Sequence, residues 1–284
     1  MMNSEQFQHI QFNQASLQDF DDCHRRFYLR HVRKLAWPAV KSQPIKENEI
    51  FREQGVAFHR MVHQYFLGVP EKKLSDLYLD EPIRSWWRNF LFSKQTLPGL
   101  TNPDGRLLPE FSLTTSIENH KLTAKFDLIA VTPEAIIIYD WKTSQQHPLR
   151  KTLENRLQTI VYPFVVAKSG AYLVHNKESF KPENICLTYW FVNDPENPEQ
   201  FQYSRQQMKK DEANLISKVA LIESMIERGE DGFELTTQEK RCSYCTYRSL
   251  CNRGVHAAEI EQSSEIVGFE SIELSFDQIT EIEF

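Results

Sequence analysis

The sequence has 284 residues, of which 40% are hydrophobic and 25% are charged. This ordinary globular mixture excludes disordered, collagen-like and long coiled-coil proteins. No apolar run approaches the roughly 18 residues that a membrane-spanning helix needs, and the first residues lack the basic region and apolar core of a secretory signal. We therefore expect a cytoplasmic protein that has no membrane partner.

The net charge of −6 is unevenly distributed along the chain. Residues 255–284 contain eight acids and no Lys or Arg, so removing them leaves a net charge of +2 for residues 1–254. A basic face on this larger part is compatible with a nucleic-acid partner. The densest basic run contains Arg25, Arg26 and Arg30, although on charge alone a solvated helix face explains it as well.

The first third of the chain predicts helices. Residues 15–34 and 47–67 have apolar side chains near helical spacing. Two prolines make a loop of residues 35–46, because proline lacks the backbone N–H that a helix interior uses. A third helical stretch covers residues 72–97 and is broken by Pro82.

The middle of the chain changes to the pattern of strands. The segment Ala135–Tyr139 is apolar throughout, as expected of a strand that is buried on both faces. The predicted strands are residues 107–117, 121–131, 134–141, 184–193 and 200–205, and the predicted helices between and after them are residues 149–168 and 206–229.

This order of elements predicts one mixed α/β domain over residues 1–254. Its parts are an N-terminal helical part (15–105), a core (106–229) and a cysteine-rich segment (230–254), followed by an acidic tail (255–284).

Asp140 and Lys142 end the buried strand and carry the strongest chemical signal. Residues at i and i+2 on a strand point to the same face. If the preceding strand pairs with this one as a hairpin, Asp127 converges on Asp140. Carboxylate oxygens are the ligands that Mg²⁺ prefers, and a nearby ammonium can assist water and neutralise developing charge. Glu110, one strand earlier, offers a third acid.

Two further motifs accompany these residues. Gly55-x-x-x-His59 lies on the second predicted helix, and Gln158-x-x-x-Tyr162 lies on the helix after the lysine. The complete series, taken in order over most of residues 15–254, resembles the RecB-like branch of the PD-(D/E)XK nuclease superfamily. The resemblance implies a restriction-endonuclease-like fold, with a mixed β-sheet core flanked by helices.

The resemblance also implies a role for each matching position. Asp127, Asp140 and His59 would bind Mg²⁺ or Mn²⁺, with the Trp141 carbonyl as a further ligand. Lys142 would be the catalytic lysine. The remaining positions are Glu110, which would support the metal or water, and Gln158 and Tyr162, which would line the site and touch the substrate backbone. Without the resemblance, His59 would be interpreted as a core histidine.

The implied function is a metal-dependent deoxyribonuclease, specifically a single-strand-acting exonuclease in DNA repair, recombination or CRISPR adaptation. A helicase or a CRISPR adaptation protein would be its protein partner. Arg25, Arg26 and Arg30 could follow the DNA strand, because single-strand grooves combine cations with stacking rings. Two other classes stay open: a non-catalytic DNA-binding accessory protein and a zinc-dependent nucleic-acid-binding module.

The five cysteines point to a second metal site, because disulfides are rare in the cytosol. Cys242, Cys245 and Cys251 form a C-x2-C-x5-C motif, and Cys23 lies far upstream. This pattern resembles the iron–sulfur nucleases of the AddB-type and CRISPR-associated groups, which implies a [4Fe–4S] cluster on these four cysteines. The alternative is Zn²⁺ held by the three late cysteines and His256.

Overall fold

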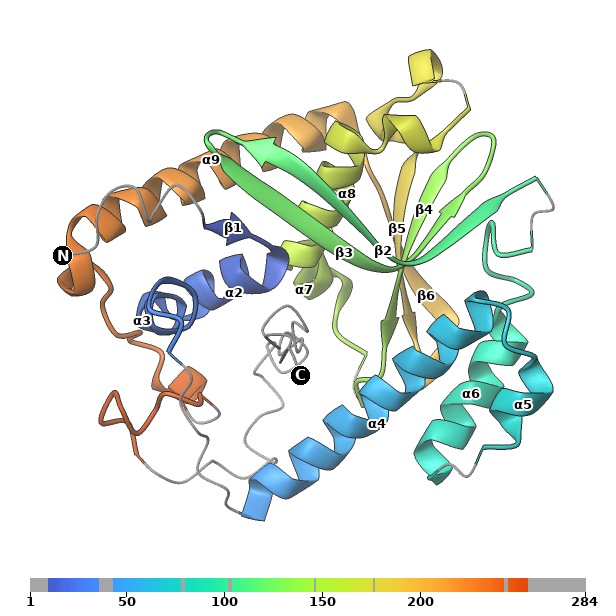
Figure 1. Ribbon diagram of the computed structural model, residues 1–284, viewed down its shortest axis with the longest axis horizontal. Coiled ribbons are helices and arrows are strands. Elements are labelled where there is room, and N and C mark those ends of the chain that lie inside the picture. The colour runs from blue at the N-terminus through green and yellow to red at the C-terminus, as the bar shows by residue number, and fades with distance from the viewer. Residues whose placement is uncertain are drawn as a thin grey trace, which may run out of the picture.

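The computed structural model describes residues 10–35, 43–77, 80–101, 104–145, 147–175, 177–242 and 245–254. Its centre is a mixed sheet of six strands with helices on both faces (Figure 1). The predicted α/β class is therefore confirmed, and the architecture is consistent with a restriction-endonuclease-like fold. The acidic tail and His256 lie outside the described residues. The division into one domain and a tail stays a prediction.

The sheet is built around two neighbouring hairpins. β2 (Arg106–Ile117) and β3 (His120–Val131) pair along their whole length, and β3 pairs antiparallel with β4 (Ile136–Lys142). β5 (Ile185–Phe191) runs parallel to β4, and β6 (Asp194–Gln202) returns antiparallel beside it. Four of these strands match those predicted from sequence, whereas the fifth, expected at 200–205, begins earlier, directly after β5, and ends at Gln202. The sixth, β1 (Gln11–Phe12), pairs in parallel with the outer half of β3.

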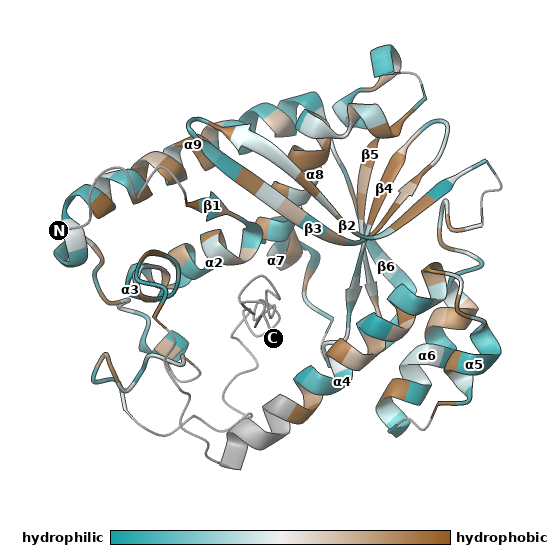
Figure 2. Cartoon of the chain, in the orientation of Figure 1, coloured by the Kyte–Doolittle hydropathy of each residue, from teal (hydrophilic) through white to brown (hydrophobic). Residues whose placement is uncertain are grey.

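Two hydrophobic cores lie on opposite faces of the sheet. All seven residues of β4 are buried, and they alternate between the cores: Ile136 and Ile138 pack on one side, and Ile137 and Tyr139 on the other. The apolar run therefore formed a strand covered on both faces, as predicted. In Figure 2, β4 and β5 are accordingly among the most hydrophobic parts of the ribbon.

The first core lies under helices from both ends of the chain, and the second under the helices between them. Aromatic side chains fill the second core, with Trp87, Phe90 and Trp190 almost completely buried. None of the described helices is long and apolar enough to cross a lipid bilayer. The first core is covered by α2 (Gln14–Asp22), α3 (His24–Phe27), α8 (Leu157–Ser169) and α9 (Arg205–Glu227), and the second by α4 (Gln43–Phe66), α5 (Glu71–Ser75) and α6 (Glu81–Ser93).

Four predicted helices differ in detail from the observed ones, and one of them, α4, begins at Gln43 within the loop expected at 35–46. The first is interrupted at Cys23, whose backbone is extended, and ends in a π-helical turn at Tyr28–Val32. Pro82 does not break a helix but lies in the first turn of α6, where its missing N–H costs nothing. The helix expected at 149–168 is divided into α7 (Arg150–Glu154) and α8.

The hairpin of β2 and β3 changes the direction of its side chains at Asp127. Phe126 packs in the first core, whereas Leu128, two residues later, packs in the second. In a regular strand these two residues would share a face. Across the hairpin, Glu110 stands in register with Asp127 and has a left-handed φ of 50°. Irregularities of this kind re-aim side chains and recur beside active sites.

Candidate active site

Asp127 and Asp140 meet where β3 and β4 end their pairing. The partners Leu128 and Tyr139 set a register in which the two aspartates stand opposite each other. The backbone N–H of Trp141 donates to Asp127 Oδ2 at 2.8 Å. The Asp127 side chain therefore accepts a hydrogen bond from the backbone of the neighbouring strand. The hairpin that the sequence predicted is thus formed and brings both carboxylates to one edge of the sheet.

Gln158 links the acid and the lysine of β4. Asp140 and Lys142 point toward α8, and Lys142 Nζ lies 2.7 Å from Asp140 Oδ2. The Gln158 amide accepts from Lys142 Nζ at 2.9 Å and donates to Asp140 Oδ1 at 3.0 Å. Tyr162, one helical turn further on, has its hydroxyl oxygen 3.4 Å from Gln158 Nε2. The motif on α8 therefore fixes both functional groups of β4.

α4 approaches the site from the other face of the sheet and contributes His59. Its Nδ1 lies 3.4 Å from Asp127 Oδ1. Four residues earlier, a Cβ on Gly55 would lie only 2.9 Å from Thr143 Oγ1. The glycine therefore allows the helix to touch the end of β4, and the spacing of one helical turn places His59 beside Asp127.

Burial and charge set the protonation of these groups. Burial raises the pKa of Asp140 to about 6, and the charge of Asp127 adds to this while Lys142 opposes it. Burial would also raise the pKa of Asp127, but His59 and the Trp141 N–H outweigh it and hold that pKa below its usual value. Burial alone would lower the pKa of His59, yet the Asp127 carboxylate raises it to about 9.

The donor set suits a hard divalent cation. Two carboxylates converge, and Asp140 Oδ2, which lies 2.7 Å from the Lys142 ammonium, already attracts positive charge. Among these residues, however, no three His, Cys, Asp or Glu side chains already form a group that could hold a metal ion. His59 would complete the set only after losing its proton, since metal binding and protonation compete. The His59 and Asp127 side chains keep 31% and 19% of their surface accessible, so an ion can reach them.

Residues 11–252 match the model of the PD-(D/E)XK nuclease superfamily. The chain belongs to this superfamily. The fold agrees with a crystal structure of a candidate exonuclease from Eubacterium rectale, with a TM-score of 0.51 and 12% identity over 94% of this chain and 99% of that one. A crystal structure of SSO0001 covers 86% of each chain at 13% identity, but its TM-score of 0.38 supports no conclusion. A comparison with curated proteins found no match.

In this nuclease, the Glu110 carboxylate forms an ion pair with a lysine that lies outside the pair of aspartates. Its Oε2 lies 2.7 Å from Lys125 Nζ, and its left-handed backbone sets it apart from the regular alternation of β2. Its register opposite Asp127 keeps it beside the site. The role in supporting metal or water remains a prediction.

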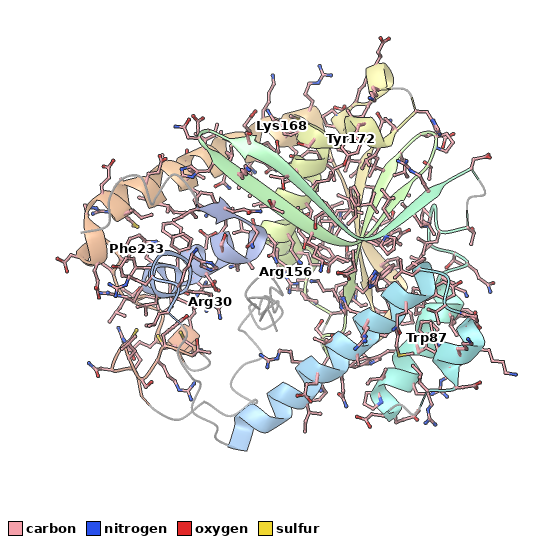
Figure 3. All side chains as sticks on the ribbon, viewed as in Figure 1. Arg30, Trp87, Arg156, Lys168, Tyr172 and Phe233 are labelled. Atoms are coloured by element: carbon pink, nitrogen blue, oxygen red, sulfur yellow. The ribbon has the colours of Figure 1, made fainter. Side chains whose placement is uncertain are left out.

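The three arginines proposed for DNA contact form ion pairs with acids. Arg25 pairs with Glu230 at 2.6 Å, and Arg26 pairs with Asp19 at 2.8 Å. Arg30, labelled in Figure 3, pairs with Asp19 at 2.9 Å. Each guanidinium is at least three quarters buried. The structure thus gives these residues a part in holding the N-terminal helices together, and their contact with DNA stays a prediction.

One residue of the site was not recognised from the sequence. Tyr189 on β5 is the direct partner of Asp140 in the parallel ladder. Lys142 Nζ lies 5.4 Å from the centre of its ring, and its hydroxyl is 2.9 Å from Thr159 Oγ1. No motif spacing marks this position. Only the register between β4 and β5 shows that Tyr189 lies beneath the ammonium.

The four predicted cluster cysteines come together from both ends of the nuclease. Cys23 lies at the break between α2 and α3, close enough to the other three thiols to contribute to the raised pKa of each of them. Burial is the main cause that raises the pKa of Cys251 to about 11, and the neighbouring thiols add to it. None of the four is in a disulfide. The thiols fit a shared metal centre by chemistry, although they do not already form one among the described residues.

Several contacts hold the cysteine segment against the N-terminal helices. Phe233, labelled in Figure 3, stacks on Tyr28 with ring centroids 4.8 Å apart. The Tyr247 hydroxyl donates to the Leu35 carbonyl at 2.7 Å, and Arg241 forms an ion pair with Asp22. The closeness of the cysteines therefore follows from packing of the protein itself.

Proposed function

We propose that this nuclease is a metal-dependent deoxyribonuclease that hydrolyses phosphodiester bonds, and that it acts as an exonuclease on single-stranded DNA or single-stranded ends. The observation that carries the proposal is the array of Asp127, Asp140, Lys142 and Gln158 at one edge of the sheet. Metal-assisted hydrolysis of a phosphodiester uses carboxylates that converge on the ion and a cation that offsets charge, and this array supplies both.

Asp127 and Asp140 would hold Mg²⁺ or Mn²⁺, with His59 and the Trp141 carbonyl as further ligands. The bound ion would stabilise the charge that develops on the phosphate and on the leaving oxygen. The Trp141 N–H keeps the Asp127 carboxylate turned toward β4. His59 restrains the other oxygen of the same carboxylate.

Lys142 would orient the attacking water and offset negative charge in the transition state. Its ammonium is held from two sides, by Asp140 and by the Gln158 carbonyl oxygen, so its position costs no reorganisation during the reaction. Gln158 acts as a positioning residue for both partners. Tyr162, whose hydroxyl lies beside Gln158, would touch the substrate backbone, and Glu110 would support the metal or the water.

The four cysteines would hold a [4Fe–4S] cluster that joins Cys23 to the C-terminal segment. Four thiolates are the standard ligand set for such a cluster. The support in this protein is that all four thiols lie near one another although more than 200 residues separate Cys23 from the others. The zinc alternative uses three of them and leaves Cys23 out.

Cleavage of labelled oligonucleotides tests the proposed activity. Purified protein with Mg²⁺ or Mn²⁺ should degrade single-stranded DNA stepwise from an end, and linear DNA faster than a closed circle. Lys142→Gln should lower the rate by about 10²–10³-fold, the usual effect of losing one preorganised charge-stabilising group. Lys209→Gln, an exposed lysine on α9, is the matched control and should cleave normally.

DNA binding, measured in a chelator so that no cleavage occurs, is compared with cleavage in divalent ions to separate a nuclease from a non-catalytic accessory protein. A non-catalytic accessory protein would bind DNA but leave it intact with every divalent ion tried. Equal cleavage by wild type and the Lys142→Gln protein would show that the active site lies elsewhere.

A further inference from the structure

The outer half of the β2–β3 hairpin has a polar face that none of the described helices covers. On the opposite face, Leu113, Ile117 and Leu122 are buried in the first core. The uncovered side is mostly exposed, and Figure 1 shows the hairpin extending away from the rest of the sheet. We call this side the open strip. It consists of Gln11 from β1, Ser112, Thr114 and Ser116 from β2, and Lys121, Thr123 and Lys125 from β3.

The strip is ordered by its own cross-strand contacts. Thr114 and Thr123 are direct partners, and their hydroxyl oxygens lie 2.8 Å apart. The Gln11 amide donates to Thr123 Oγ1 at 2.6 Å. The partners on either side, Ser112 with Lys125 and Ser116 with Lys121, complete three rows. Successive rows are about 7 Å apart, because each spans two residues of a strand.

The chemistry of the strip is that of a phosphate-backbone contact. It presents hydroxyls, an amide and two ammonium groups, which are the donors that proteins use toward phosphate oxygens and sugars. The strip residues include no carboxylate and no aromatic ring. Polar faces are normal for antiparallel sheets. The open strip differs from an ordinary polar face because it contains hydrogen-bond donors and no acidic residue, so it favours an anionic ligand.

The strip also leads directly into the candidate active site. Lys125 and Asp127 are only two residues apart on β3, so the strip ends where the candidate active site begins. The acid that pairs with Lys125 is Glu110, which stands in register with Asp127. A chain of phosphates lying along the three rows would therefore arrive at the aspartate that the proposed function places at the reacting phosphate.

We propose that the open strip binds the sugar–phosphate backbone of a single nucleic-acid strand and guides it to Asp127. This inference rests on the proposed function and specifies how that function engages its substrate. The contact reads no bases, because the strip offers no stacking ring, so binding here is independent of sequence. The strand lies along β2 and β3, and the continuity of the strip with the active site fixes where it ends.

Two variants test the strip by different means. Lys121→Gln with Lys125→Gln removes two charges, and Thr114→Val with Thr123→Val removes two hydroxyls at nearly constant volume. The matched control is Lys168→Gln with Lys209→Gln, which removes two charges from α8 and α9 (Lys168 is labelled in Figure 3). The affinity for a homopolymeric single-stranded oligonucleotide is measured in a chelator at several salt concentrations. Thermal unfolding confirms that each variant is folded.

The lysine variant should bind about 10-fold more weakly than wild type, and its salt slope should fall by about 0.7 for each phosphate that the protein no longer neutralises. The threonine variant should bind several-fold more weakly with an unchanged salt slope. Binding by the control should stay within twofold of wild type. Equally weakened binding in the lysine variant and the control would overturn the proposal, because only net charge would then matter. So would unchanged binding in both strip variants.

Cleavage kinetics keep this inference separate from the proposed function. If the enzyme cleaves DNA, the strip variants should raise KM and leave kcat nearly unchanged. Cleavage with wild-type KM in both strip variants would refute the strip and leave the nuclease standing. If wild type binds the oligonucleotide through the strip but cleaves nothing with any divalent ion, the proposed activity fails and the strip stands.

Discussion

Gly55 and Thr143 bring α4 into contact with the end of β4, since a Cβ on the glycine would lie 2.9 Å from the threonine hydroxyl. This contact fixes the position of the helix that carries His59 relative to the strand that carries Asp140 and Lys142. A shift of either element changes the distance between His59 and the carboxylates. Misplacement by about 1 Å can cost as much as about 10²-fold in rate.

Gly55→Ala should therefore lower kcat about 10-fold while the protein remains folded. The added methyl group pushes α4 away from β4 unless the threonine hydroxyl yields. Combining it with Thr143→Ala removes the clashing atom, because the Thr143 Cβ lies at an acceptable 3.8 Å. The double variant should recover the activity of Thr143→Ala alone. A double variant as slow as Gly55→Ala would show that the glycine serves another purpose.

Tyr189→Leu should reduce kcat about 10-fold with little change in DNA affinity. The ring lies 5.4 Å from Lys142 Nζ and helps to hold the ammonium beside Asp140. Tyr189→Phe keeps the ring and removes only the hydroxyl that meets Thr159, so it should retain most of the activity. An equal reduction of kcat in the two variants would assign the effect to the hydroxyl, and an effect confined to KM would remove Tyr189 from the positioning of Lys142.

The sequence predicted the strands and their chemistry but not their register. The alternating pattern along β3 and the apolar run in β4 were enough to predict the hairpin that brings Asp127 to Asp140. The parallel register of β4 and β5 depends on contacts between distant segments, so the position of Tyr189 could not be inferred from spacing. The change of face at Asp127 is likewise a property of two paired strands and leaves no periodic signal in either one.

The arginine-rich helix shows a different limit of prediction from sequence. Its basic residues suggested a surface for DNA, but Asp22 and Asp19, four and seven residues before Arg26, pair with it, and Asp19 also pairs with Arg30. The signal for these pairs was present in the spacing of four residues between Asp22 and Arg26. The remaining partner, Glu230, comes from the far end of the chain and was not predictable.

Asp19 should make the stability of the fold depend on pH. Burial would raise the pKa of this carboxyl, but the hydrogen bond to His31 and the charges of Arg26 and Arg30 outweigh it and lower the pKa below its usual value. A lowered pKa means that the stabilisation is present above the unfolded-state value near 3.8 and is lost as the pH falls through the folded-state value.

Asp19→Asn should therefore destabilise the protein by about 3 kcal/mol at neutral pH, the usual effect of removing one partner of a buried ion pair. The difference from wild type should be constant above about pH 5 and shrink toward zero in more acidic solution. Urea unfolding of both proteins at a series of pH values measures it. A difference that stays constant at low pH would mean that the charge of Asp19 has no part in stability.

The cysteine site should contain iron bound by all four predicted cysteines. Protein purified without oxygen should be brown, and metal analysis should find iron and sulfide in place of zinc. Cys23→Ser should lose the cluster and lower the melting temperature, because the energy of metal binding is also folding energy where the unfolded chain has no site. Cys186→Ser is the matched control, since this thiol lies on β5 away from the other four, and it should keep the full iron content.

The zinc alternative makes the opposite prediction for two residues, and this contrast decides the nature of the site. A zinc site on Cys242, Cys245, Cys251 and His256 would be colourless, would survive Cys23→Ser and would be lost in His256→Ala. An iron–sulfur cluster needs Cys23 and is indifferent to His256. The position of Cys23 at the break between α2 and α3, among the other three thiols, favours the cluster. Anaerobic Cys23→Ser protein that retains one zinc and contains no iron would refute it.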